Sequence, residues 1–224
     1  MPINPTKLLI IFVTAATILT FTKASFLKDK SHQKFDTEAL NSNLLHTKGI
    51  FPFNKDVSKN QCSTSYFYEL FADKQDRFTI SEHEVTTDDG YILKLFKVSL
   101  SEDEKLSKNI PNQDKAIFLQ HGIVDSADGW FVYEESKSIG FHLANKGFEI
   151  WVGNSRGNKY SHTHVIKDID WSEYFSFSFD EMGQYDIPAF YNYILKNSKA
   201  EKIVYIGHSQ GTAQMFAALT DPTN

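Results

Sequence analysis

Cysteine is almost absent from the sequence, and this limits how the chain can be stabilised. Cys62 is the single cysteine among 224 residues, so no disulfide bond can form within the chain. A lone thiol is far more often a structural residue than a reactive one. The length is nevertheless sufficient for one sizeable domain with its own hydrophobic core.

Clusters of basic residues are missing as well. The chain has 23 lysines and arginines against 28 acidic residues, a net charge of −5 and a pI of about 5.9. Without a basic stripe, nucleic acid is excluded as a partner. Hydrophobic residues make up 41% of the chain and aromatic residues 14%. This is the composition of a globular protein rather than a disordered one.

Long apolar runs are scarce, and the one that exists lies near the N-terminus. It extends for about 14 residues from Leu8 to Phe21, behind a lysine. A membrane-spanning helix needs about 20 apolar residues, and Thr22 and Ala24 are the small residues expected before a signal-peptide cleavage site. We therefore predict a cleaved signal peptide over residues 1–24, entry into the secretory pathway, and no membrane span in the mature chain.

The rest of the sequence divides into two parts. Residues 25–64 are polar with little periodicity and predict a loosely structured segment, whereas residues 65–224 alternate between strand and helix patterns. Strands are expected at 82–86, 91–98, 116–119, 148–152 and 203–206, and helices at 65–71, 138–144, 186–195 and 210–220, with a solvated loop at 101–114. Asp-Gly between the first two strands predicts a hairpin. The order predicts an α/β fold with a mostly parallel sheet and an N-terminal antiparallel hairpin.

The amphipathic patterns also predict which side chains face the core. Inward-facing residues are expected at Ile139, Leu143 and Ala144 in one helix and at Ala213, Phe216, Ala217 and Leu219 in the last helix.

One stretch carries the chemistry. The apolar strand 203–206 leads directly into Gly207-His208-Ser209-Gln210-Gly211, and a helical pattern follows at once. G-x-S-x-G between a buried strand and a helix is the nucleophile elbow of α/β-hydrolases, where glycines permit a tight turn that exposes the serine. We predict that Ser209 is the nucleophile. The alternative is a serine that only caps an ordinary helix.

An oxyanion hole is expected beside this serine. One donor is the backbone N–H of Gln210, the residue after the nucleophile, and the second comes from the loop after an earlier strand. His121-Gly122-Ile123 follows such a strand, and Ile123 is the best candidate for the second N–H. The alternative for this loop is a simple turn.

Four stretches, in order, resemble the successive signatures of the acid lipase family, which contains the gastric and lysosomal acid lipases. They are residues 119–123, 151–158, 177–189 and 207–212, and residues 84–93 resemble the family's opening hairpin. The resemblance implies a secreted or lysosomal enzyme that hydrolyses neutral lipid esters, triacylglycerols or sterol esters, at a lipid–water interface without metal or cofactor. It assigns the nucleophile to Ser209 and the oxyanion donors to Ile123 and Gln210.

The resemblance also implies that the acid and base of the catalytic triad follow the elbow helix, together with a lid and further strands. The sequence stops at Asn224, so none of its residues takes these roles. We therefore expect the N-terminal part of an α/β-hydrolase core, an inactive fragment in which residues 203–206 form an exposed, aggregation-prone edge strand.

The other candidate residues have plainer explanations. Histidines 121, 162, 164 and 208 are expected to be structural rather than a catalytic base or metal ligands. Asp186 is expected to cap a helix. Arg156 either braces its loop or binds a substrate carboxylate. Trp130, Phe131 and Trp151 either line an acyl pocket or belong to the core.

Two other functions remain open on the sequence. A protein with an incomplete triad could be a non-catalytic lipid-binding or regulatory protein. The elbow also occurs in α/β-hydrolases with other substrates, such as thioesterases and peptidases.

Overall fold

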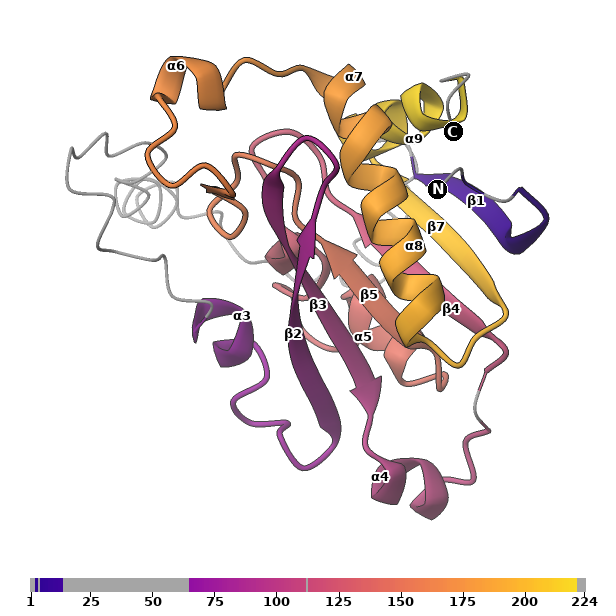
Figure 1. The fold of residues 1–224 in the computed structure, drawn as a ribbon. Coiled ribbons are helices and arrows are strands. Elements are labelled where there is room, and N and C mark those ends of the chain that lie inside the picture. Colours follow the sequence, from indigo (N-terminus) through magenta and orange to yellow (C-terminus); the bar gives the residue numbers. More distant parts are fainter. Residues whose placement is uncertain (1–2, 4, 14–64, 112, 221–224) are drawn as a thin grey trace, which may run out of the picture. The chain divides into compact units, whose positions relative to one another are not determined.

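The computed structural model describes residues 3, 5–13, 65–111 and 113–220 (Figure 1). The predicted cleavage site after Ala24 and the predicted loose segment 25–64 lie outside the described residues. Those that are described belong to one unit, which comprises Met1–Ala15 and Thr64–Asn224.

A seven-stranded sheet forms the centre of this unit, with the strand order β1-β7-β4-β5-β3-β2 and β6 paired to β3. The strands are β1 (Leu8–Val13), β2 (Phe78–Thr86), β3 (Tyr91–Leu100), β4 (Lys115–Gln120), β5 (Glu149–Gly153), β6 (Thr163–His164) and β7 (Lys202–His208). β1, β7, β4 and β5 run parallel, whereas β3 is antiparallel to β2 and β5. The predicted α/β fold, a mostly parallel sheet with an antiparallel hairpin, is confirmed.

The hairpin turn depends on a glycine. Gly90 has a φ of 97°, in the left-handed region that favours glycine. A Cβ at this position would lie 2.7 Å from Nε2 of His164, so the close approach of β6 also requires the missing side chain. The Asp-Gly signal therefore located the turn correctly.

Helices flank the sheet (Figure 1). They are η1 (Pro5–Lys7), α3 (Ser65–Glu69), α4 (Glu102–Ser107), η2 (Ala127–Trp130), α5 (Ile139–Ala144), α6 (Trp171–Tyr174), α7 (Phe179–Glu181), the π-helical η3 (Met182–Asp186), α8 (Ile187–Asn197) and α9 (Gln210–Thr220). The expectation of a solvated loop at 101–114 was wrong at its start. Ser101 accepts a hydrogen bond from the Glu104 N–H at 3.2 Å and begins α4, whose first turn is acidic.

Hydrophobic clusters cover both faces of the sheet. On one face, α3 and α5 contribute phenylalanines such as Phe67 and Phe141. On the other, α8 and α9 contribute Phe190 and Met215. Parallel strands with both faces covered carry continuous apolar runs, as the inner residues of β4, β5 and β7 do.

Several predicted core assignments can now be decided. Trp130, Phe131 and Trp151 are buried in these clusters, so they belong to the core rather than to an acyl pocket. The inward assignment of Ile139 was wrong, because its side chain is exposed. Phe216 and Leu219 are exposed as well. The buried side of α9 is instead formed by Gly211, Gln214, Met215 and Ala218.

The predicted open edge at β7 was also wrong. β1 pairs with the whole inner part of that strand in parallel, from Leu8 opposite Ile203 to Val13 opposite His208. The physical reason is that an apolar run suits a buried strand as well as a leader. β1 lies within the predicted signal peptide, so cleavage after Ala24 would remove it. None of the helices that the structure describes has both the length and the hydrophobicity of a membrane-spanning segment.

Candidate active site

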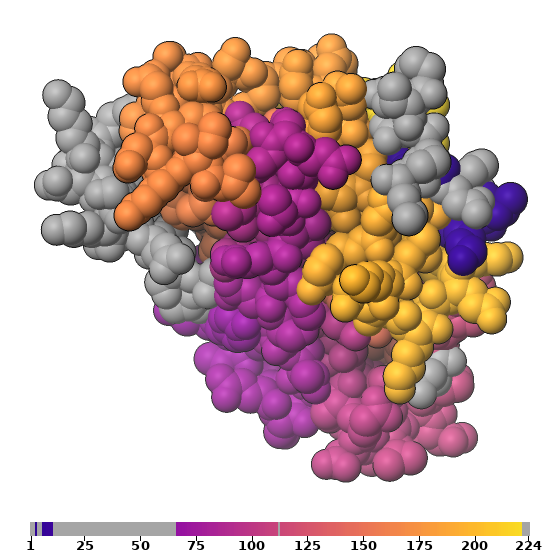
Figure 2. Space-filling model, viewed as in Figure 1, coloured from indigo at the N-terminus to yellow at the C-terminus, as the bar shows by residue number. Residues whose placement is uncertain are grey.

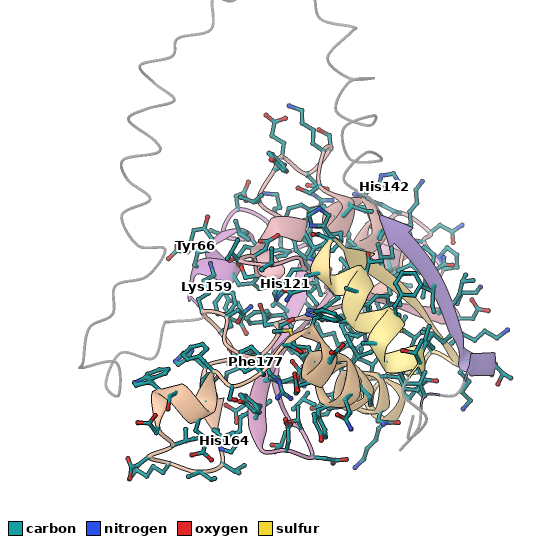
Figure 3. All side chains as sticks on the ribbon, turned by 90° about the horizontal axis from the view of Figure 1, so that it is seen from above. Tyr66, His121, His142, Lys159, His164 and Phe177 are labelled. Carbon is teal, nitrogen blue, oxygen red and sulfur yellow. The ribbon has the colours of Figure 1, made fainter. Side chains whose placement is uncertain are left out.

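Three loops begin at the same edge of the sheet, where β4, β5 and β7 end. Gln120, the last residue of β4, lies opposite Gly153 of β5 and Gly207 of β7 in the parallel register. Loop 121–124, loop 154–158 and the turn at Ser209 therefore begin side by side at the carboxyl edge of the sheet. Figure 3 looks down on this edge, with His121 in the middle of the face. In open α/β sheets, this edge is where ligands bind.

Ser209 occupies a strained turn. Its φ of 51° lies in the left-handed region, which a serine rarely adopts. Gly207 and Gly211 make the turn possible, because a Cβ on Gly207 would lie 2.9 Å from the carbonyl carbon of Gly211. The strand, the turn and α9 thus have the geometry of a nucleophile elbow.

The predicted oxyanion loop lies against the serine. A Cβ on Gly122 would be 3.1 Å from Cβ of Ser209, so there is no room for a side chain between the loop and the side chain of Ser209. Gln210 is the first residue of α9, where the N–H groups have no intrahelical acceptor. The arrangement can supply N–H donors from Ile123 and Gln210 to a developing oxyanion. Both roles, and the role of Ser209 as nucleophile, stay predictions.

His121 fixes this loop through both ring nitrogens. Nδ1 donates to the carbonyl oxygen of Gly122 at 2.7 Å, and Nε2 accepts from the backbone N–H of Ser155 at 3.1 Å. Because a backbone N–H can only donate, Nε2 must be unprotonated and the ring neutral. Burial lowers the pKa of His121, which favours the same neutral state. His121 therefore has a structural role, in which its ring connects loop 121–124 with loop 154–158; we call this arrangement the His121 clamp.

This clamp predicts a pH dependence of stability. In the unfolded chain His121 takes up a proton below about pH 6.5, whereas in the folded protein it stays neutral to lower pH. The unfolded state then binds more protons, so the free energy of unfolding falls as the pH falls below that value. We expect His121→Gln to be less stable at pH 7.5 but to lose less stability between pH 6.5 and 5, with a slope smaller by up to about 1.4 kcal/mol per pH unit.

Urea unfolding at several pH values measures these slopes. His142→Gln is the matched control, because it removes a histidine whose side chain is exposed on α5. Equal slopes for His121→Gln and the unmodified protein would contradict the assignment of a neutral, clamped ring.

Three buried polar side chains, whose contact the sequence did not reveal, connect the predicted oxyanion loop with α9. The hydroxyl oxygen of Ser155 accepts from Nε2 of Gln120 at 2.8 Å and from Nε2 of Gln214 at 2.9 Å. All three side chains are buried. Gln120 precedes loop 121–124 and Gln214 lies on α9, so Ser155 connects this loop to the helix that follows Ser209. A glutamine that ends the apolar run 116–119 was the one available signal.

Arg156 forms the charged support of the site. Its Nε donates to Oδ1 of Asp186 at 2.8 Å, and its two terminal nitrogens bond both carboxylate oxygens of Asp89 at 2.6 and 2.9 Å. The guanidinium carbon lies 3.8 Å from the centre of the Tyr91 ring. The interpretation that Arg156 braces its loop is the one that these contacts support, because its donors are used within the protein.

The assignment of Asp186 as a helix cap was wrong. Its side chain makes no capping hydrogen bond to α8 and instead faces Arg156, whose backbone N–H it also accepts at 3.1 Å. Burial raises the pKa of Asp186 to about 6, against the opposing effect of the guanidinium. A helix-start pattern cannot distinguish a cap from an ion pair that forms across the fold.

Two further candidate histidines, His164 and His208, have structural surroundings. Nε2 of His164 lies 3.0 Å from the carbonyl oxygen of Asp89, and its Nδ1 accepts from the N–H of Ile166 at 3.0 Å. His208 lies beside Gly122, where an added Cβ would be 3.1 Å from Nδ1. Within the described part of the chain, no group of three His, Cys, Asp or Glu side chains could hold a metal ion.

Comparisons with known proteins agree with this architecture. The α/β-hydrolase fold family matches residues 115–223, and a partial α/β-hydrolase lipase region matches residues 73–134. Gastric triacylglycerol lipase of Rattus norvegicus is 42% identical over 147 residues, which are 65% of this chain and 36% of the rat protein. Lysosomal acid lipase/cholesteryl ester hydrolase of Homo sapiens is 39% identical over 143 residues, 64% of this chain and 35% of the human protein.

The matched stretch therefore spans about a third of the length of these relatives. Among solved structures, an esterase of Pyrococcus furiosus has a TM-score of 0.46 and 17% identity, covering 65% of this chain and 48% of that chain. The family matches and the relatives confirm the resemblance of the four sequence motifs: the chain is a homologue of the gastric and lysosomal acid lipases, and it carries the α/β-hydrolase fold.

Proposed function

We propose that the protein is a serine ester hydrolase of the acid lipase type that acts on neutral lipid esters, triacylglycerols or sterol esters. The observation that carries the proposal is the strained Ser209 with the backbone of Gly122 against its side chain. A free serine hydroxyl is a weak nucleophile, so the reaction also needs an adjacent base that takes its proton. The names of the relatives, gastric triacylglycerol lipase and lysosomal cholesteryl ester hydrolase, support the substrate class.

The proposed reaction is acyl transfer in two steps. The hydroxyl oxygen of Ser209 attacks the ester carbonyl, and the alcohol leaves with a proton to give an acyl-enzyme, which water then hydrolyses. The N–H groups of Ile123 and Gln210 stabilise the oxyanion in both steps. The resemblance places the acid and base of the triad after the elbow helix, and turnover depends on those two groups as well as on Ser209. The same relatives support a secreted or lysosomal location.

Covalent labelling tests the nucleophile. In the phosphonate adduct the phosphoryl oxygen takes the position of the oxyanion. The oxyanion hole and substrate binding together retain about 10³-fold or more of catalysis in serine hydrolases that lack a triad member. We expect a phosphonate adduct, located by mass spectrometry, on Ser209 in preference to every other serine, and none at this peptide in Ser209→Ala. Equal, slow labelling of all serines in a folded sample would overturn the proposal and favour a non-catalytic lipid-binding protein.

The substrate class needs a separate measurement. Triolein, cholesteryl oleate, a thioester and a peptide are compared at pH 5 and 7.5, with Ser209→Ala as the blank. Preference for the thioester or the peptide would favour the other α/β-hydrolase functions over the lipase proposal.

A further inference from the structure

Apolar side chains are exposed on the segment that follows β6. Val165, Ile166, Trp171 and Phe175 are all exposed, and they define what we term the aromatic ledge. Figure 2 shows the surface of this segment in orange, beside the tip of the β2–β3 hairpin. Exposed apolar groups that occur singly need no explanation, but four exposed apolar side chains within eleven residues of sequence make this segment a candidate binding surface.

The ledge is held in place by the core. Between Trp171 and Phe175 lies the buried Tyr174, whose hydroxyl donates to the carbonyl oxygen of Ser161 at 3.0 Å. The carbonyl of Tyr174 in turn accepts from the hydroxyl of Tyr91. Because these hydrogen bonds attach α6 to the core through Tyr174, the exposed rings of Trp171 and Phe175 are held in one arrangement.

The two outer rings also pack on each other. Trp171 and Phe175 stack with their centroids 5.4 Å apart and an angle of 15° between the ring planes. Asp170 caps α6 by accepting from the N–H of Ser172 at 2.8 Å. The pair is thus a preorganised apolar surface, and binding to it costs little conformational entropy.

Charge around the ledge limits what can bind there. Residues 165–175 contain three acidic side chains, Asp168, Asp170 and Glu173, and one basic side chain, Lys167, so this segment has a net negative charge. An anionic membrane or an acidic protein would be repelled. An uncharged or zwitterionic lipid surface carries no such penalty, and tryptophan is the side chain that favours the boundary between lipid and water.

The position of the ledge connects it with the candidate site. α6 lies at the same end of the sheet as α7 and the start of α9 (Figure 1). The chain reaches it from the carboxyl end of β5, through the loop that holds Ser155 and Arg156. In Figure 3, α6 stands at the rim of the face that has His121 near its centre.

We propose that the aromatic ledge binds the surface of an uncharged lipid phase, such as a triacylglycerol droplet coated with phosphatidylcholine, and holds the carboxyl edge of the sheet against it. The choice of lipid rests on the proposed function. Binding at the ledge does not require Ser209, so the two proposals can fail separately.

The tryptophans of the chain provide a direct reporter. Trp171 is 49% exposed, whereas Trp130 is 7% and Trp151 0% exposed. Acrylamide therefore quenches mainly Trp171 in the free protein. On addition of triolein emulsion coated with phosphatidylcholine, we expect a blue shift of the emission and loss of most of this quenching. Ser209→Ala should behave in the same way.

Paired variants locate the binding surface. Trp171→Ala/Phe175→Ala is expected to weaken partitioning onto the emulsion by about tenfold or more, measured by flotation. Phe216→Ala/Leu219→Ala, which removes an equally exposed apolar pair from α9, is expected to change partitioning less than about twofold. Circular dichroism of each variant verifies the fold.

Several outcomes would overturn the ledge proposal. They are unchanged quenching on lipid, equal losses in the two double variants, or stronger partitioning onto phosphatidylglycerol vesicles than onto phosphatidylcholine. Protection of Trp171 without lipid, together with a dimer in light scattering, would identify a second copy of the chain as the occupant. Lipid binding at the ledge without labelling of Ser209 would reject the hydrolase proposal and leave the ledge proposal standing.

Discussion

Arg156→Met is expected to destabilise the protein by about 3–5 kcal/mol, because it leaves the buried carboxylate of Asp186 without a counter-charge. The side chains of Arg156 and Asp186 are each 1% exposed. Methionine keeps much of the volume of the arginine stem, so the change removes the charge and its five hydrogen-bond donors rather than the packing. Urea unfolding at pH 7.5 measures the loss.

Two further variants separate charge from packing. Arg77→Met removes an arginine that pairs with Glu104 and Glu135 near the surface, where its side chain is 28% exposed, and we expect a cost of about 1 kcal/mol. Adding Asp186→Asn to Arg156→Met should recover part of the stability. Equal costs for the two arginine variants, or no recovery in the double variant, would show that the buried charge is not the cause.

The deficit of Arg156→Met should also depend on pH. Burial already raises the pKa of Asp186 to about 6 beside the guanidinium, and losing that cation raises it further. A carboxyl whose pKa is higher in the folded state binds its proton more tightly there, so stability is lost as the pH rises through that pKa. The variant should therefore lie closer to the unmodified protein at pH 5 than at pH 7.5.

Local signals explain what the sequence predicted well. The β2–β3 turn was predicted from Asp89-Gly90. The elbow was predicted from an apolar strand, two glycines and the start of a helical pattern, which together span only about ten residues. Such features depend on backbone geometry that a few neighbouring residues determine. The position of Gly122 against Ser209 also followed, because parallel strands bring their carboxyl ends to one edge.

Contacts between distant parts of the chain were not predictable in this way. Arg156 is 67 residues from Asp89 and 30 from Asp186, and nothing local selects these partners among the other carboxylates. The pairing of β1 with β7 joins the two ends of the described chain. A six-residue apolar run carries no information on whether it becomes a strand, a helix or a leader.

The inner side of α9 was mispredicted for a different reason. Hydrophobicity alone placed Phe216 inside, yet the buried position is taken by the polar Gln214, which donates to the Ser155 hydroxyl. Gly211 is buried one turn earlier on the same side. The orientation of α9 therefore depends on the close approach of Gly211 to the end of β4 and on the buried hydrogen bond of Gln214. An amphipathic pattern contains information on neither contact.

Gly211→Ala is expected to disturb the site through the contacts of its added methyl group. The new Cβ would lie 2.5 Å from the carbonyl oxygen of Gln120 and 2.8 Å from that of His121. Both are backbone atoms of the strand end and the oxyanion loop, so neither can move aside alone. Either α9 or the loop must shift, which separates the N–H groups of Ile123 and Gln210.

We expect a loss of about 1–3 kcal/mol in the free energy of unfolding from overpacking, and phosphonate labelling of Ser209 slowed about 10²-fold through the misplaced oxyanion donors. Gly129→Ala is the matched control. The atoms nearest to its Cβ would belong to the carboxylate of Asp125, 2.8 Å away. A side-chain carboxylate can shift at the cost of its hydrogen bond from the N–H of Ser126, whereas a backbone carbonyl cannot move alone. If Gly211→Ala is as stable and as reactive as Gly129→Ala, the close contact between α9 and the end of β4 does not determine the geometry of the oxyanion hole.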